Sequence, residues 1–288
     1  MSEKLTMAKA LNRGLRRALQ ADPKVLLAGE DIGKLGGVFR ITEGLQAEFG
    51  ENRVVDSPLA ESGIVGTAVG LALRGYRPVV EIQFDGFVYP AFDQIVSQVS
   101  RMRFRSMGRL SVPMVIRIPY GGGIGAIEHH SESPEAYFAH TPGLKVVSCA
   151  NANDAYWMIQ QAIQSDDPVV FLEPKRRYHV KDMVNFTSRP APMHQAAITR
   201  YGTDATLLCY GPMVKTCLDA AAVADLGQVA GADEGDEGAG QDGLPACLLH
   251  FPCDLRGGAP AIAPLSHGNH GEKITGSVSW QLFLVGAV

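Results

Sequence analysis

Glu61 is the residue of this chain whose type and setting best suit proton chemistry. The twelve residues that follow it carry no charge, and Pro58 stands three positions before it. If this segment forms a helix, its first turn lies in a packed interior, where a carboxyl group needs a partner or keeps its proton. Such a group can donate or exchange a proton near neutral pH. The alternative is a solvated glutamate that offsets the helix dipole.

Two adjacent histidines, His129 and His130, follow a glycine-rich stretch at residues 121–125. An imidazole can exchange protons with a reacting oxygen at physiological pH. Adjacent side chains in an extended loop point to opposite sides, so we expect at most one of the two to enter a site. The glycines permit tight turns, but their spacing does not match the dinucleotide-binding fingerprint. Taken alone, either histidine also fits a structural role.

Four aromatic residues crowd the end of a predicted strand at residues 78–84 and the segment after it. They are Phe84, Phe87, Tyr89 and Phe92. An aromatic face at this position could stack on a heterocyclic ligand, or the rings could fill the core between sheet and helix.

The elements that would position these residues alternate between strand and helix periods. Strands are expected at residues 25–28, 53–55, 78–84, 113–118, 145–148 and 169–172. Helices are expected at residues 8–19, 42–49, 61–73, 90–105 and 153–164. This alternation predicts an α/β fold with a doubly wound, mostly parallel sheet covered on both faces, and ligands at the strand carboxyl ends. A strand at 204–210 and a helix at 214–224 would begin a second unit, and residues 225–288 read as irregular and poorly ordered.

Composition narrows the function classes. A net charge of −4 over 288 residues gives no footprint for nucleic acid, and the basic clusters at residues 101–105 and 175–177 read as solvated faces or structural ion pairs. Five cysteines without a C-x-x-C pair argue against a disulfide framework or a zinc ribbon, and no metal site is expected. The same cysteine usage is typical of a reducing cytosol, so we expect a cytoplasmic protein. No apolar run reaches the roughly 18 to 20 residues that span a bilayer, so we expect no membrane anchor.

Together these segments resemble the beta subunit of the thiamine-diphosphate-dependent decarboxylating component of 2-oxoacid dehydrogenase complexes. The resemblance runs from about Leu5 to Ala224. Its strongest stretches are residues 29–32, 36–40, 58–66, 81–84, 90–94 and 130–136. Residues 83–87 and 133–140 are closer to the branched-chain members, such as 3-methyl-2-oxobutanoate dehydrogenase, than to pyruvate dehydrogenase.

The resemblance implies roles for five residues of this chain. Glu61 would hydrogen-bond a ring nitrogen of the thiamine diphosphate pyrimidine, and Phe87 would face that ring, with Leu59 and Gln83 as its neighbours. His130 would help to bind the intermediate and the incoming lipoyl group. The implied activity is oxidative decarboxylation of branched-chain 2-oxoacids with reductive acylation of lipoyl groups; pyruvate is the nearest alternative substrate.

The resemblance also implies partners. Members of the wider superfamily bind Mg²⁺ and the diphosphate with a Gly-Asp-Gly motif, which this chain lacks. An alpha subunit would therefore supply those ligands in an alpha2beta2 heterotetramer. This heterotetramer would dock on a lipoyl-bearing acyltransferase core. Without an alpha subunit we expect no activity, and the missing motif disfavours a self-sufficient transketolase.

The resemblance divides the chain into three parts. Residues 1–186 would form the pyrimidine-binding domain, residues 187–224 a linker and the start of a second transketolase-type domain, and residues 225–288 a tail that departs from the family. A shifted reading frame or a degenerate gene end would produce this departure. The rival hypothesis is a truncated, inactive remnant whose tail makes assembly and docking doubtful.

Overall fold

A six-stranded parallel sheet forms the centre of this computed structural model, which describes residues 1–188, 191–202, 206–231 and 247–250. The strand order is β3-β2-β4-β5-β7-β6, and each neighbouring pair is parallel. The strands are β2 Val25–Gly29, β3 Val54–Asp56, β4 Arg77–Glu81, β5 Val115–Tyr120, β6 Lys145–Ser148 and β7 Val169–Pro174. Because β3 and β4 lie on opposite sides of β2, the order reverses there, and such a switch point opens a crevice at the strand carboxyl ends. The predicted α/β class is confirmed.

Two helices cover one face of this sheet, α1 (Met7–Ala21) and α6 (Ala152–Gln164). The side chain of Thr6 accepts from the backbone N–H of Lys9 and caps α1, whose apolar stripe is buried. The two helices cross closely at Gly14, where an added Cβ would lie 2.5 Å from the Ile159 side chain. This close approach holds α6 against the sheet through α1.

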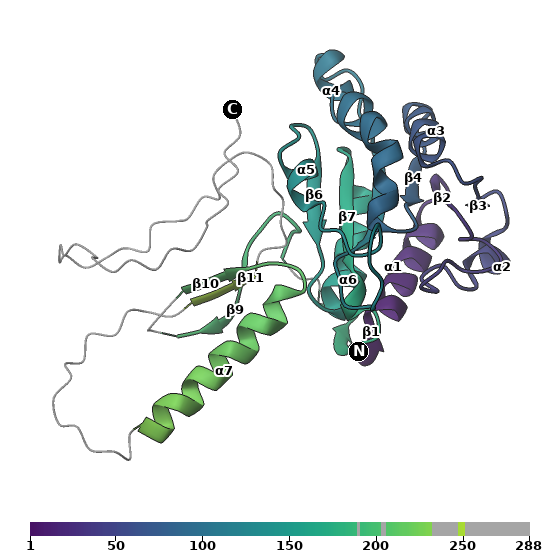
Figure 1. The fold of residues 1–288 in the computed structure, drawn as a ribbon. Coiled ribbons are helices and arrows are strands. Elements are labelled where there is room, and N and C mark those ends of the chain that lie inside the picture. The colour runs from purple at the N-terminus through teal and green to yellow at the C-terminus, as the bar shows by residue number, and fades with distance from the viewer. Residues whose placement is uncertain (189–190, 203–205, 232–246, 251–288) are drawn as a thin grey trace.

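The opposite face is covered by α3 (Glu61–Leu73) and by the segment from η1 (Asp85–Ala91) through the π-helix η2 (Gln94–Val99). Apolar residues of α3 and of this segment bury against β4 and β5 in a second core cluster. The short helices of the unit are α2 Leu45–Phe49, α4 Met102–Arg105, α5 Glu135–Ala139 and η3 Lys175–Arg177. Figure 1 shows α4 projecting at one end of the molecule, away from α7.

The remaining elements form two small sheets and one long helix. Strand β1 (Ser2–Thr6) pairs antiparallel with β8 (Lys181–Asn185). Strand β11 (Cys247–His250) lies between β10 (Thr206–Cys209) and β9 (Ala197–Tyr201), and α7 spans Met213–Gly231. The unit formed by β9, β10, β11 and α7 stands to one side of the main sheet (Figure 1). None of the helices in the described residues has the length and apolarity needed to cross a membrane.

Several predicted elements differ from the structure. The strand expected at 78–84 ends at Glu81. The helix expected at 90–105 is divided among the end of η1, the π-helix η2 and α4, because the i→i+5 hydrogen bonds of η2 replace the α-helical ladder there. Strands β1, β8 and β9 were not predicted. Helix α7 continues to Gly231 and β11 lies within the stretch expected to be irregular, while residues 232–246 and 251–288 lie outside the described part.

Candidate active site

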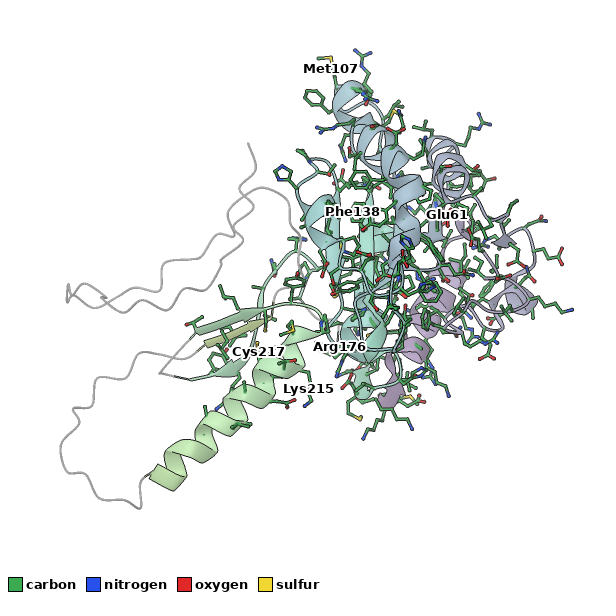
Figure 2. The ribbon with its side chains drawn as sticks, in the orientation of Figure 1. Glu61, Met107, Phe138, Arg176, Lys215 and Cys217 are labelled. Carbon is green, nitrogen blue, oxygen red and sulfur yellow. The ribbon has the colours of Figure 1, made fainter. Side chains whose placement is uncertain are left out.

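Glu61 is the first residue of α3, separated from the carboxyl end of β3 by residues 57–60, and it is buried at 7% exposure. The predicted burial is therefore confirmed over the solvated alternative. Figure 2 shows Glu61 beside the main sheet, far from α7 with its labelled residues Lys215 and Cys217.

A second buried carboxyl group, that of Glu30, lies near Glu61. Glu30 directly follows β2 and is also 7% exposed. Burial raises the pKa of Glu30, the carboxyl groups of Glu61 and Asp31 raise it further, and a hydrogen bond from the Ala60 backbone opposes them. Within the described residues, Oε1 of Glu30 has no hydrogen-bond partner. Glu30 was not predicted as a site residue. It is the first residue after a buried strand, and this position is where such folds place ligand-binding residues.

The loop after β4 joins this acidic pair to the aromatic residues. Gln83 donates from Nε2 to Oδ2 of Asp31 at 3.3 Å. Asp31 and Glu30 both follow β2, so this bond links the carboxyl ends of two neighbouring strands. Phe84 and Phe87 follow Gln83, with ring centroids 5.8 Å apart in an edge-on arrangement.

The imidazole of His130 packs against these two rings. Its centroid lies 4.4 Å from that of Phe84 and 5.2 Å from that of Phe87. Nδ1 of His130 lies 2.9 Å from the carbonyl oxygen of Glu128, and a carbonyl can only accept, so Nδ1 carries the proton. In the neutral ring, Nε2 is then free to accept a proton. The side chain of His129 is 54% exposed, so the two histidines lie in different surroundings, although the loop is not extended here, since Glu128 and His129 have positive φ.

The structure therefore brings together Gln83, Phe87 and His130 at the strand carboxyl ends, with Glu61 joined to them through Glu30 and Asp31. Leu59 is different, since it is 81% exposed. The two other aromatic residues lie against α5 instead: Phe92 packs on Phe138 at 5.9 Å and on Tyr137 at 6.0 Å, and the exposed Tyr89 lies 6.4 Å from Tyr137.

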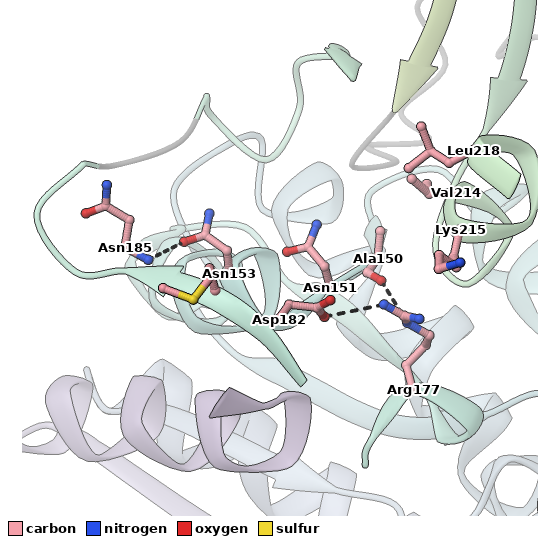
Figure 3. Close-up of a pocket in the computed structure, with 10 residues that line it drawn as sticks. Ala150, Asn151, Asn153, Arg177, Asp182, Asn185, Val214, Lys215 and Leu218 are labelled. Carbon is pink, nitrogen blue, oxygen red and sulfur yellow. Dashed lines mark hydrogen bonds and ion pairs between the residues drawn. The ribbon is translucent and has the colours of Figure 1, made fainter. Parts of the chain in front are cut away.

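A separate cavity of about 450 Å³ lies between the start of α6, strand β8 and α7 (Figure 3). Arg177 enters it and is paired with Asp182 at 3.3 Å, as the figure shows. This pair, together with Arg103 and Asp167, confirms structural ion pairs in the two basic clusters. No candidate site residue lines this cavity. The described residues contain no cluster of three or more acidic, histidine or cysteine side chains that could hold a metal ion.

The model for the transketolase pyrimidine binding domain matches residues 3–181. The chain belongs to this family. Within it, the chain is homologous to beta subunits of 2-oxoacid dehydrogenases, as expected from the resemblance. The beta subunit of the pyruvate dehydrogenase E1 component of Leifsonia xyli subsp. xyli is 63% identical over 222 residues, which are 77% of this chain and 66% of that protein. The 3-methyl-2-oxobutanoate dehydrogenase subunit beta of Mycobacterium tuberculosis is 54% identical over 226 residues, 78% of this chain and 65% of that protein.

The matched part of this chain thus spans about two thirds of the length of these relatives. Among solved structures, a split gene transketolase described as an inactive beta4 tetramer superposes with a TM-score of 0.66 at 19% identity, covering 86% of this chain and 71% of that one. A transketolase from Leishmania mexicana gives a TM-score of 0.61 at 16% identity, covering 87% of this chain and 34% of that one. These two structures share the fold of this chain.

Proposed function

We propose that this chain is the beta subunit of a 2-oxoacid dehydrogenase and forms the pyrimidine-binding half of a thiamine diphosphate site. The observation that carries the proposal is the burial of Glu61 next to Glu30 at the carboxyl ends of β2 and β3. Burial and the neighbouring carboxyl groups of Glu61 and Asp31 raise the pKa of Glu30, and a pair of carboxyl groups in such a setting suits proton exchange with a basic ring nitrogen.

The residues present fit the cofactor. Oε1 of Glu30 is buried without a partner in the described residues, and the rings beside His130 offer an apolar wall for a heterocycle. Four residues would hold the pyrimidine: Leu59, Glu61, Gln83 and Phe87. Bound thiamine diphosphate supplies an electron sink for the negative charge left on the substrate carbon when carbon dioxide departs.

The side chains of this chain have separate tasks in the proposal. Glu61 holds and exchanges a proton at the cofactor ring, and Phe87 excludes water from that ring. Nε2 of His130 accepts or returns a proton during transfer of the acyl group to a lipoyl sulfur. These tasks need Glu61 and His130 at different parts of one crevice, and Gln83 with Asp31 joins the two parts.

We also propose how the chain is divided into domains and which partners it binds. Residues 1–186 form the pyrimidine-binding domain, residues 187–224 the linker and the start of a second domain, and residues 225–288 the tail that departs from the family. An alpha subunit supplies the Mg²⁺ and diphosphate ligands in an alpha2beta2 heterotetramer in the cytoplasm. The acyltransferase core that bears the lipoyl group accepts the product.

Two substrate classes are candidates, the branched-chain 2-oxoacids and pyruvate. The stretches at 83–87 and 133–140 favour branched-chain 2-oxoacids, as does the relative named for 3-methyl-2-oxobutanoate, whereas the 63% identical relative is named for pyruvate. We propose the branched-chain acids, with pyruvate as the second candidate.

Coexpression with a cognate alpha subunit tests the proposal. The purified complex should decarboxylate 3-methyl-2-oxobutanoate only when thiamine diphosphate and magnesium are present. A preference for pyruvate would change the substrate but keep the reaction. Failure of the two chains to co-purify would instead support an inactive remnant.

A further inference from the structure

The ammonium group of Lys175 is buried at the start of η3, and all three of its hydrogens are in use. It donates to both carboxylate oxygens of Asp85 at 2.8 Å each and to the backbone carbonyl of His130 at 2.8 Å. The side chains of Lys175 and Asp85 are both fully buried. The ammonium also lies 5.7 Å from the ring centroid of Phe84, which packs on the His130 imidazole.

The next residue after Asp85 holds the same loop. The backbone N–H of Gly86 donates to the carbonyl of His129 at 3.0 Å. A Cβ at Gly86 would lie 2.4 Å from Cα of His129, so only glycine allows the loop to approach this closely. The loop itself needs external support, because Glu128 and His129 both have positive φ, at 38° and 61°.

Fold stability alone gives a weak reason to bury this ion pair. Removing a lysine and an aspartate from water is costly, and well-packed apolar residues often serve as well. Burial also lowers the pKa of Lys175, and Asp85 offsets part of that effect. What an apolar pair could not provide is the third hydrogen bond, which ends on the backbone of His130.

We propose that Lys175 and Asp85 are positioning residues that fix the backbone of His130 and thereby hold its imidazole against Phe84 and Phe87. This inference rests on the proposed function for its consequence in the reaction. Asp85 orients and neutralises the ammonium, and Lys175 ties the loop after β5 to the loop after β4. Neither side chain touches the reacting atoms.

Hydrogen exchange on the full chain without any partner tests the placement of the loop. In Asp85→Leu/Lys175→Met, residues 121–134 should exchange about ten- to a hundredfold faster, the loss expected for one charge-assisted hydrogen bond, while the main sheet exchanges as in the parent. If the double variant does not fold, Asp85→Asn replaces it in the experiment. This variant keeps a hydrogen-bond acceptor and should accelerate exchange in the same residues to a smaller extent. Lys145→Met is the matched control, because Lys145 pairs with Asp167 at 3.2 Å at the start of β6. Unchanged exchange in 121–134, or equal acceleration throughout the sheet, would overturn the inference.

A double-mutant cycle in the alpha-beta complex tests the consequence for the reaction. The Asp85→Leu/Lys175→Met pair should lower lipoyl acylation about ten- to a hundredfold, and the same pair should have little further effect when His130 is already alanine. Fully additive losses would show that the ion pair acts on something other than His130. If no alpha subunit yields activity, the proposed function fails, and the exchange experiment still decides the positioning role.

Discussion

Arg117 on β5 donates two hydrogen bonds to Glu173 on β7, from Nε at 2.6 Å and from Nη2 at 2.9 Å. Its remaining terminal nitrogen, Nη1, donates to Glu81 on β4 at 2.6 Å. Glu173 also accepts from the hydroxyl of Tyr178 at 2.7 Å. All of these side chains are buried, so one guanidinium joins three adjacent strands just below the loops that carry the candidate site.

Replacing Arg117 should therefore destabilise the fold strongly. Arg117→Met leaves two buried carboxyl groups without a cation, and burial already raises the pKa of Glu81 against the effect of Arg117. We expect the free energy of unfolding to fall by about 3 to 5 kcal/mol, measured by urea denaturation.

Arg13→Met is the matched control, since Arg13 pairs with Glu3 at the surface with side chains 40% and 42% exposed. It should cost no more than about 1 kcal/mol. A loss of that small size in Arg117→Met would show that the buried network contributes little to stability.

Glu30 should make the stability of the chain depend on pH. Its pKa is raised above 4.5 in the folded state, so the folded protein holds the proton more tightly than the unfolded chain. The stability from this proton is complete below pH 4.5 and is lost as the pH rises through the raised pKa.

Glu30→Gln removes the ionisation and keeps an acceptor for the Ala60 backbone. Its melting temperature should exceed that of the parent at about pH 8, and the difference should shrink towards about pH 4. Thermal unfolding across this range is the measurement, with the exposed Glu51→Gln as the control for loss of one charge. A difference that grows at low pH would contradict the assigned environment of Glu30.

Much of the main sheet could be predicted from the sequence because its signals are local. The apolar runs that became β2, β5, β6 and β7 are flanked by turn residues, and buried parallel strands have this pattern. In contrast, β1 was missed because it pairs with β8, near the other end of the domain, and a five-residue edge strand has no strong period of its own. The π-helix η2 interrupts a segment whose apolar spacing resembled one continuous α-helix.

The candidate site was predictable where residue type alone was informative. Glu61 and His130 stand out because a glutamate precedes an uncharged helix and a histidine pair follows a glycine-rich loop. The residues proposed to position His130 could not be found this way, since Lys175 and Asp85 lie 90 residues apart and meet only in the folded chain. Glu30 likewise gains its significance from a neighbour that only the fold brings close, the carboxyl group of Glu61 at the start of α3.

Glu61→Gln should abolish decarboxylation in the complex with an alpha subunit while leaving the fold intact. The amide is nearly isosteric but cannot exchange the proton, and loss of a general acid–base group typically costs about 10²- to 10⁴-fold in rate. Decarboxylation would be followed with an artificial electron acceptor, and Glu51→Gln is again the charge control. Turnover equal to the parent would remove Glu61 from the mechanism.

The two adjacent histidines allow a matched test of the acyl-transfer step. His130→Ala removes the imidazole that packs against Phe84 and Phe87, whereas His129→Ala removes a mostly exposed ring one position earlier. We expect His130→Ala to lower lipoyl acylation by about 10²-fold or more while thiamine diphosphate affinity stays nearly constant, because the proposed task of Nε2 is at the acyl group rather than at the cofactor. His129→Ala should leave both quantities close to the parent values. Acylation rates and cofactor titration, measured on the same preparations, separate the two effects. A selective loss of cofactor affinity in His130→Ala would assign that side chain to cofactor binding instead.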